Sequence, residues 1–134
     1  MSQASSQTKK ILLLDDDKFL LDMYSIKFSG AGYEVKTADA SDVALKILRD
    51  GYDPTVMLVD ILMPKNVGGL EFLDQVRTEK LAPHATTIIL TNQGSSEDVG
   101  QAKKLNVDGY IVKATTIPSD VLKEVENIQT SRKS

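Results

Sequence analysis

Four short runs of apolar residues, with no charged residue inside them, stand out along the chain. They are Ile11–Leu14, Val56–Val59, Ile88–Leu90 and Tyr110–Val112. Continuous apolar runs of this length are typical of strands that are buried on both faces of a parallel sheet. Residues 33–37 instead alternate apolar and polar side chains, which predicts a strand at the edge of the sheet.

The segments between these runs carry apolar residues at helical spacing. The spacing predicts helices around four sets of residues: Phe19, Leu20, Met23, Tyr24, Ile26 and Phe28; Ala44, Ile47 and Leu48; Leu70, Leu73 and Val76; and Val121, Val125 and Ile128. Ser41 is the expected N-cap of the second set, and Pro118 falls in the first turn of the last one.

A further helix is predicted more weakly between the last two strands. Ser95 and Asp98 form a capping box ahead of Val99 and Ala102, but Gly100 lies inside the pattern. With this segment the chain alternates strand and helix five times.

The alternation predicts one α/β domain of the flavodoxin-like, doubly wound class. Right-handed crossovers give a five-stranded parallel sheet with five helices on its two faces. An edge strand at residues 33–37 favours the strand order 2-1-3-4-5. We expect the domain to span residues 9–129, with a disordered polar lead at residues 1–8 and a frayed polar tail at residues 130–134.

Polar residues follow the buried runs at the point where each predicted strand ends. Asp15 and Asp16 follow the first run, Asp60 the second, Thr91 the third and Lys113 the fourth. In a sheet of this order the carboxyl ends of the strands form the ligand-binding edge, so these side chains should converge. Three neighbouring carboxylates repel one another unless a cation lies among them, and oxygen ligands favour Mg2+.

The charge, cysteine and histidine content of the chain exclude several classes of function. The chain has 134 residues, 16 Lys+Arg against 19 Asp+Glu and a formal net charge of -3, which argues against direct binding to nucleic acid or to an anionic membrane. It has no cysteine, so a disulfide or thiolate site is excluded, and this fits the cytoplasm. His84 is the sole histidine and is expected to be an exposed surface residue with no function.

Four motifs at the strand ends carry a family resemblance. They are Ile11-Leu-Leu-Leu-Asp-Asp16, Val59-Asp-Ile-Leu-Met-Pro64, Ile88-Ile-Leu-Thr91 and Tyr110-Ile-Val-Lys113, separated by 44 (16 to 60), 31 (60 to 91) and 22 (91 to 113) residues. In this order and spacing they resemble the receiver domain of bacterial response regulators over residues 9–129. The resemblance implies a phosphoacceptor in two-component signalling, not an enzyme, with a histidine kinase or histidine phosphotransfer protein and an unknown downstream protein as its partners.

The resemblance also implies a role for each site residue. Asp60 would accept the phosphoryl group, and Asp16, Asp60 and the backbone carbonyl of Leu62 would hold Mg2+, while Asp15 acts through metal-bound water. Thr91 and Lys113 would bind the phosphoryl oxygens. The ring of Tyr110 would then fill the space that the Thr91 hydroxyl leaves, which reshapes the surface around strand 4, helix 4 and strand 5.

Some positions depart from the family pattern. Ala114 follows Lys113 where the family usually has a proline, and the loop after Pro64 is one residue longer and carries Gly68 where an aspartate is common. Asn92 replaces a small residue. Leu62 and Gln93, which flank the phosphoryl group, offer no acid or base to hydrolytic water, and this predicts a phosphoryl group with a moderate to long lifetime.

Each of these residues also has a purely structural interpretation. Asp15, Asp16 and Asp17 are consistent with a helix N-cap run, in which Asp17 caps in either case. Tyr110 by itself indicates a core aromatic, and Gly68-Gly69 indicates a loop and a helix start. Two other functions stay open: a pseudo-receiver that binds proteins without being phosphorylated, and a phosphatase, which would need an acid where Leu62 stands.

Overall fold

The protein is a parallel sheet of five strands in the order β2-β1-β3-β4-β5. The computed structural model describes residues 9–61, 68–91, 100, 104, 107–112 and 117–133. The strands are β1 (Lys10–Leu14), β2 (Glu34–Ala38), β3 (Val56–Asp60), β4 (Thr86–Thr91) and β5 (Gly109–Val112). Every neighbouring pair is parallel, so the predicted fold class and strand order are confirmed.

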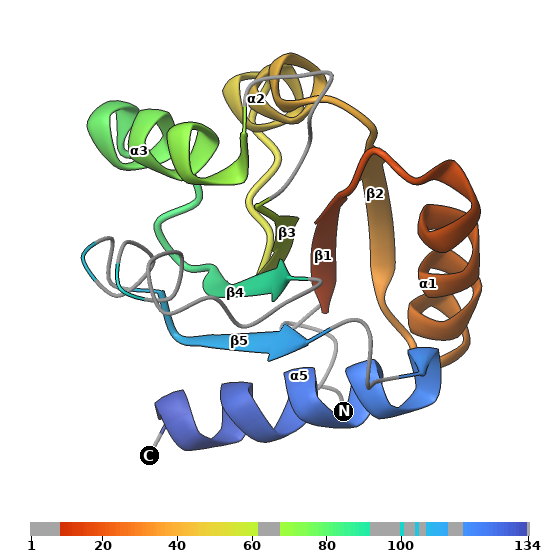
Figure 1. The fold of residues 1–134 in the computed structure, drawn as a ribbon. Coiled ribbons are helices and arrows are strands. Elements are labelled where there is room, and N and C mark those ends of the chain that lie inside the picture. The colour runs from red at the N-terminus through yellow and green to blue at the C-terminus, as the bar shows by residue number, and fades with distance from the viewer. Residues whose placement is uncertain are drawn as a thin grey trace, which may run out of the picture.

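Helices cover both faces of the sheet. They are α1 (Lys18–Gly30), α2 (Ser41–Arg49), α3 (Gly69–Glu79) and α5 (Pro118–Lys133). Helices α1 and α5 pack on one face, and α2 and α3 pack on the other (Figure 1). The helix expected between Ser95 and Ala102 lies outside the described residues, apart from Gly100.

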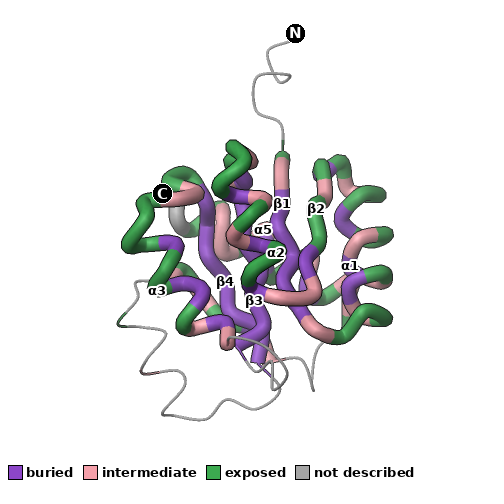
Figure 2. Tube along the Cα trace, turned by 90° about the horizontal axis from the view of Figure 1, so that it is seen from above, coloured by how far each residue is buried: buried purple, intermediate pink, exposed green. Residues whose placement is uncertain are grey.

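The two-sided cover explains the continuous apolar runs. In β1, Ile11 and Leu13 point into the core beneath α1 and α5, whereas Leu12 and Leu14 point into the core beneath α2 and α3. Successive side chains of a strand face opposite ways, so every position of a doubly covered strand must be apolar. The central strands are accordingly buried along their length (Figure 2). Strand β2 lies at the edge, where Ala38 alone of its residues is buried, as its alternating sequence predicted.

Three local predictions need correction. Ala40, not Ser41, is the N-cap of α2, and Ser41 is buried as the first residue of that helix. Helix α1 buries Leu21, Tyr24 and Phe28, of which Leu21 is not in the predicted pattern. Helix α5 continues past residue 129 to Lys133, and in this last part the hydroxyl of Thr130 donates a hydrogen bond to the carbonyl of Glu126 (2.9 Å).

Neutral hydrogen bonds tie the amino edge of the sheet together. The hydroxyl of Tyr52 lies 3.2 Å from the carbonyl oxygen of Ile11 and 3.1 Å from that of Glu34, so it links β1 to β2. The side chain of Gln129 in α5 donates to the carbonyl of Thr55 (3.3 Å) and accepts from the hydroxyl of Tyr33 (3.3 Å). This edge lies opposite the one where the predicted site residues end their strands.

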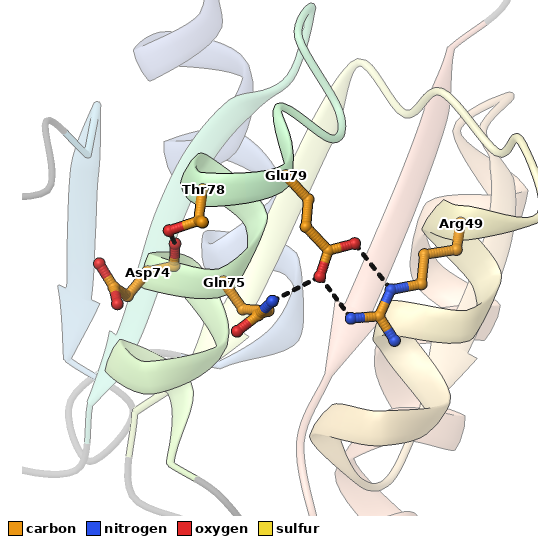
Figure 3. A network of polar contacts seen from close by, with 5 residues as sticks. All are labelled: Arg49, Asp74, Gln75, Thr78 and Glu79. Carbon is orange, nitrogen blue, oxygen red and sulfur yellow. Dashed lines mark hydrogen bonds and ion pairs between the residues drawn. The ribbon is translucent and has the colours of Figure 1, made fainter.

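An ion pair joins α2 to α3, the two helices that share one face of the sheet. The guanidinium of Arg49 in α2 binds both carboxylate oxygens of Glu79 in α3, and Gln75 also donates to Glu79 (Figure 3). The hydrogen bond from Arg49 lowers the pKa of Glu79 to about 2. The pair is exposed, so it orients α2 against α3 and contributes little to stability. No helix within the described residues is long and apolar enough to cross a membrane.

Candidate functional site

Three aspartates meet at the carboxyl edge of the sheet. Asp15 follows β1 directly, Asp60 ends β3, and the register aligns Leu14 with Val59, which places the two carboxylates side by side. With Asp16 they form a group in which one carboxylate oxygen from each residue lies within 4.8 Å of the others. Asp15 and Asp60 are buried, and Asp16 is half-buried and opens the group to solvent.

The turn after β1 sets the orientation of the Asp15 carboxylate and starts helix α1. The Asp15 amide donates to the carbonyl of Ala38 (3.2 Å), which holds the end of β1 against β2. The Asp15 carboxylate accepts from the amide of Asp17 (2.9 Å), and the Asp17 carboxylate accepts from the amide of Leu20 (3.2 Å) as the N-cap of α1. The capping role predicted for Asp17 is confirmed, while Asp15 and Asp16 remain at the sheet edge.

Asp60 sits in the most closely packed part of the site. It is 2% exposed, and the amide of Ile61 after it donates to the carbonyl of Leu90 (3.2 Å). Gly69, the first residue of α3, lies against this backbone: a Cβ atom there would be 2.3 Å from the carbonyl oxygen of Asp60 and 2.8 Å from the Cα of Ile61. Gly69 is therefore required at this helix start, a role that the sequence did not reveal because the contact arises only in the folded chain.

Thr91 completes the described part of the edge. It ends β4, is 1% exposed, and follows Leu90, which the register pairs with Asp60. The hydroxyl-bearing residue therefore lies on the strand next to Asp60, one position further along. The structure thus brings Asp15, Asp16, Asp60 and Thr91 to one edge, as the sequence predicted.

Tyr110 is not a core residue. It stands in β5 opposite Ile89 and is 42% exposed, so its interpretation as a core aromatic is wrong. Strand β5 closes the sheet on this side, and a residue on an edge strand has one face open to solvent. Tyr110 is therefore a surface residue of the edge strand β5.

Five residues of interest lie outside the described part of the chain: Leu62, Asn92, Gln93, Lys113 and Ala114. Their roles stay predictions from the sequence. His84 is exposed as expected, and its Nδ1 lies 2.9 Å from a carboxylate oxygen of Asp53, which does not belong to the group of three aspartates.

The donor set fits a hard divalent cation. Carboxylate oxygens gathered within bonding reach of one ion, two of them on buried residues, match the ligands that Mg2+ and Ca2+ prefer. A cation there would offset the mutual repulsion of the carboxylates. Asp60 is the carboxylate that belongs to this group of acids and also lies next to the end of β4, where Thr91 follows its register partner Leu90.

A sheet of this order, with acidic groups after β1 and at the end of β3 and a threonine at the end of β4, defines a receiver domain. The family model for the response regulator receiver domain matches residues 11–126, and the chain belongs to this family. Its relatives are response regulators and transcriptional regulators rather than classical enzymes.

Similar curated proteins are longer than this chain. The transcriptional regulatory protein CpxR of Escherichia coli (strain K12) is 34% identical over 104 residues, which is 78% of this chain and 42% of that protein. The probable transcriptional regulatory protein TcrX of Mycobacterium tuberculosis is 28% identical over 123 residues, 92% of this chain and 51% of that protein. The chain spans about half the length of the curated relatives it matches.

Solved structures agree over nearly the whole chain. The chemotaxis response regulator CheY4 of Vibrio cholerae superposes with a TM-score of 0.80 at 29% identity and covers 91% of this chain and 99% of that one. A CheY-like receiver domain protein from Methanospirillum hungatei gives a TM-score of 0.82 at 26% identity, with coverage of 95% and 98%.

Proposed function

We propose that this receiver domain is a phosphoacceptor switch that takes a phosphoryl group on Asp60. The observation that carries the proposal is the placement of the Asp60 carboxylate, buried at the end of a central strand and grouped with Asp15 and Asp16, beside the strand that ends in Thr91. Buried acidic groups that lie close together are typical of functional sites, and phosphoryl transfer is a function that uses them.

The chemistry follows from the residue types. A carboxylate oxygen of Asp60 attacks the phosphorus of a phosphohistidine, a P–O bond forms, and the P–N bond to the imidazole breaks. The product is an aspartyl phosphate and a free histidine on the donor. Thr91, and Lys113 from outside the described residues, would bind the phosphoryl oxygens, because a hydroxyl and an ammonium stabilise the negative charge spread over them.

Asp15 and Asp16, with Asp60 and the Leu62 carbonyl, would hold Mg2+. The ion, when bound, neutralises charge on the carboxylates and on the phosphoryl oxygens. The hydrogen bond from the amide of Asp17 fixes the orientation of the Asp15 carboxylate. Asp16 is partly exposed, so the ion can reach the site from solvent. An apolar Leu62 and an uncharged Gln93 give water no base, which favours a long-lived phosphoryl group.

The signal would spread from Thr91 to Tyr110. A phosphoryl dianion on Asp60 attracts the Thr91 hydroxyl, and the half-exposed Tyr110 ring, on the neighbouring strand β5, turns into the space that opens. This shifts the population of two arrangements of the surface formed by β4, β5 and the helix that the sequence predicts after Ser95. A histidine kinase or phosphotransfer protein in the cytoplasm would supply the phosphoryl group, and the downstream protein would read the altered surface.

Intact-protein mass tests the proposal directly. Incubation with Mg2+ and acetyl phosphate should add one phosphoryl group, about 80 Da, to the wild-type chain. Asp60→Asn should stay at its original mass. Asp74→Asn removes an exposed carboxylate from α3 and should label as the wild type does, which makes it the matched control.

A second candidate function would apply if no adduct forms. In that case the domain is a pseudo-receiver, which binds proteins without being phosphorylated. Ala114 and Asn92 at family positions favour this candidate. Beryllofluoride separates the two: a phosphoacceptor binds it in the presence of Mg2+ even if its phosphate is short-lived, whereas absence of labelling, of beryllofluoride binding and of Mg2+ binding together would refute the phosphoacceptor.

A further inference from the structure

Helix α3 begins in direct contact with the end of the strand that carries Asp60. Gly69, its first residue, is buried. A Cβ atom on this residue would be 2.8 Å from the Cα of Ile61, 2.9 Å from a methyl group of Val59 and closer still to the carbonyl oxygen of Asp60. Ordinary contacts of a Cβ atom begin at 3.4 Å, so a side chain at residue 69 does not fit without movement of the backbone.

The neighbouring glycine is under no such restriction. A Cβ atom on Gly68 would be 3.3 Å from the carboxylate of Glu71, whose side chain is exposed and free to turn, and 3.5 Å from the carbonyl oxygen of Ile61. Gly69 is helical, and neither glycine has a positive φ. The need for glycine at residue 69 is therefore a need for space and not for an unusual backbone conformation.

Helix α3 is not free to move away from β3. Its inner face is buried in the core beneath α2 and α3 through Phe72, Leu73 and Val76. Its last turn is tied to α2 by the ion pair between Arg49 and Glu79 (Figure 3). A side chain at residue 69 would therefore displace the end of β3, which is the last turnless residue of the strand before the loop, rather than the helix.

The end of β3 is the place where a small displacement matters most. The carboxylate of Asp60 lies within 4.8 Å of those of Asp15 and Asp16, and its register partner Leu90 precedes Thr91. Phosphoryl transfer requires the attacking oxygen to be in line with the bond that breaks, and a misplacement of about 1 Å can lower a rate about a hundredfold.

We propose that Gly69 is a positioning residue for phosphoryl transfer to Asp60. Because it has no side chain, α3 packs directly on the backbone of Asp60 and Ile61 and keeps the Asp60 carboxylate in place beside Asp15 and Asp16. The proposal rests on the phosphoacceptor function proposed above, and it assigns to α3 a part in that function that involves no chemical group of its own.

The kinetics of Gly69→Ala test the proposal. With Mg2+ and acetyl phosphate, intact-protein mass should show a labelling rate per folded molecule about a hundredfold below that of the wild type. Calorimetric titration with Mg2+ alone is the second measurement. It should show binding about tenfold weaker, because the displaced Asp60 carboxylate no longer meets the other two at one ion.

Two control variants separate positioning from loss of stability. Gly68→Ala adds the same methyl group one residue earlier, where there is space for it. Val125→Ala removes buried side-chain volume from α5 on the opposite face of the sheet and lowers stability without contact with β3. Each should change the labelling rate per folded molecule and the Mg2+ dissociation constant less than about twofold. Urea unfolding gives the folded fraction of each variant, and trimethylamine N-oxide restores that fraction where it is low.

The outcomes distinguish this proposal from the phosphoacceptor function itself. Labelling of Gly69→Ala at the wild-type rate per folded molecule would overturn the positioning role, and so would equal losses in Gly69→Ala and Val125→Ala. If the wild type is not labelled, the phosphoacceptor function fails, and the Mg2+ titration then decides: an affinity that Gly69→Ala leaves unchanged would overturn the positioning of Asp60 as well.

Discussion

The two edges of this sheet are built on opposite physical principles. At the amino edge, neutral groups satisfy backbone carbonyls: Tyr52 bonds to Ile11 and Glu34, and Gln129 bonds to Thr55. At the carboxyl edge, Asp15 and Asp60 are buried as carboxylates close to Asp16. The first arrangement stabilises the fold by itself, whereas the second costs free energy that a bound cation would recover.

The comparison locates function within a regular fold. Both edges belong to the same strands, so backbone geometry does not distinguish them. The difference lies in which side chains end the strands and whether those side chains attract or repel. Changes at the amino edge should therefore alter stability alone, and changes at the carboxyl edge should alter stability and ligand binding together.

The largest effect on folding is expected at Gly69, where the carboxyl edge is most closely packed. Gly69→Ala places a Cβ against the backbone of Asp60 and Ile61, and overpacking of this kind should lower the free energy of unfolding by about 3 kcal/mol. Gly30→Ala is the control, because no atom lies within 4 Å of a Cβ there and helix propensity should make it neutral or slightly stabilising. Urea unfolding measures both, and equal effects would contradict the close packing.

The second largest expected effect is stabilisation of the folded chain by Mg2+ bound at the carboxyl edge. An ion that binds the folded chain alone should raise the free energy of unfolding by about 2.7 kcal/mol at one hundred times its dissociation constant. Thermal unfolding with and without Mg2+ measures the gain, which Asp16→Asn should reduce. Asp53→Asn, an exposed aspartate outside the group, should leave the gain unchanged, and a gain that survives Asp16→Asn intact would place the ion elsewhere.

Removal of one hydroxyl from the amino edge should have a smaller effect. Tyr52→Phe leaves the carbonyls of Ile11 and Glu34 without their shared donor and should cost about 1 kcal/mol in urea unfolding. Phosphorylation by acetyl phosphate should be unchanged. Loss of labelling in this variant would show that the two edges are not independent.

The effect that should be smallest at neutral pH, where it vanishes, is a pH dependence at the amino edge. Burial, with a further contribution from Glu126, raises the pKa of Tyr33 from 10.0 to about 12. The unfolded chain then releases this proton first, so the stability that the neutral hydroxyl provides is complete below pH 10 and declines as the pH rises toward 12. Tyr33→Phe should decline less over this range in chemical unfolding, and identical slopes would contradict the assignment.

Periodicity predicted the secondary structure well where burial dictates it. The continuous runs predicted β1, β3 and β4, because a strand covered on both faces must be apolar throughout. The run at Tyr110–Val112 also predicted a strand, β5, but this strand lies at the edge of the sheet, and Ile111 is its one buried residue. Helix α1 shows where the pattern was not sufficient: Phe19 and Ile26 fit the helical spacing, yet both are exposed, since a helix has more apolar residues than one face can bury. Ser41 was predicted as a cap from its type, but the cap depends on where the turn before it places the chain.

The sequence by itself determined the order of strands and helices and the acids that end the strands, because both follow from local pattern and from the rules for parallel sheets. Only the tertiary structure decided the contacts between distant segments. These include the close approach of Gly69 to Asp60, the hydrogen bonds of Tyr52 and Gln129 to backbone carbonyls, and the exposure of Phe19 and Ile26 on α1. Each depends on how the helices pack on the sheet, and this packing cannot be predicted from the local spacing of residues along the chain.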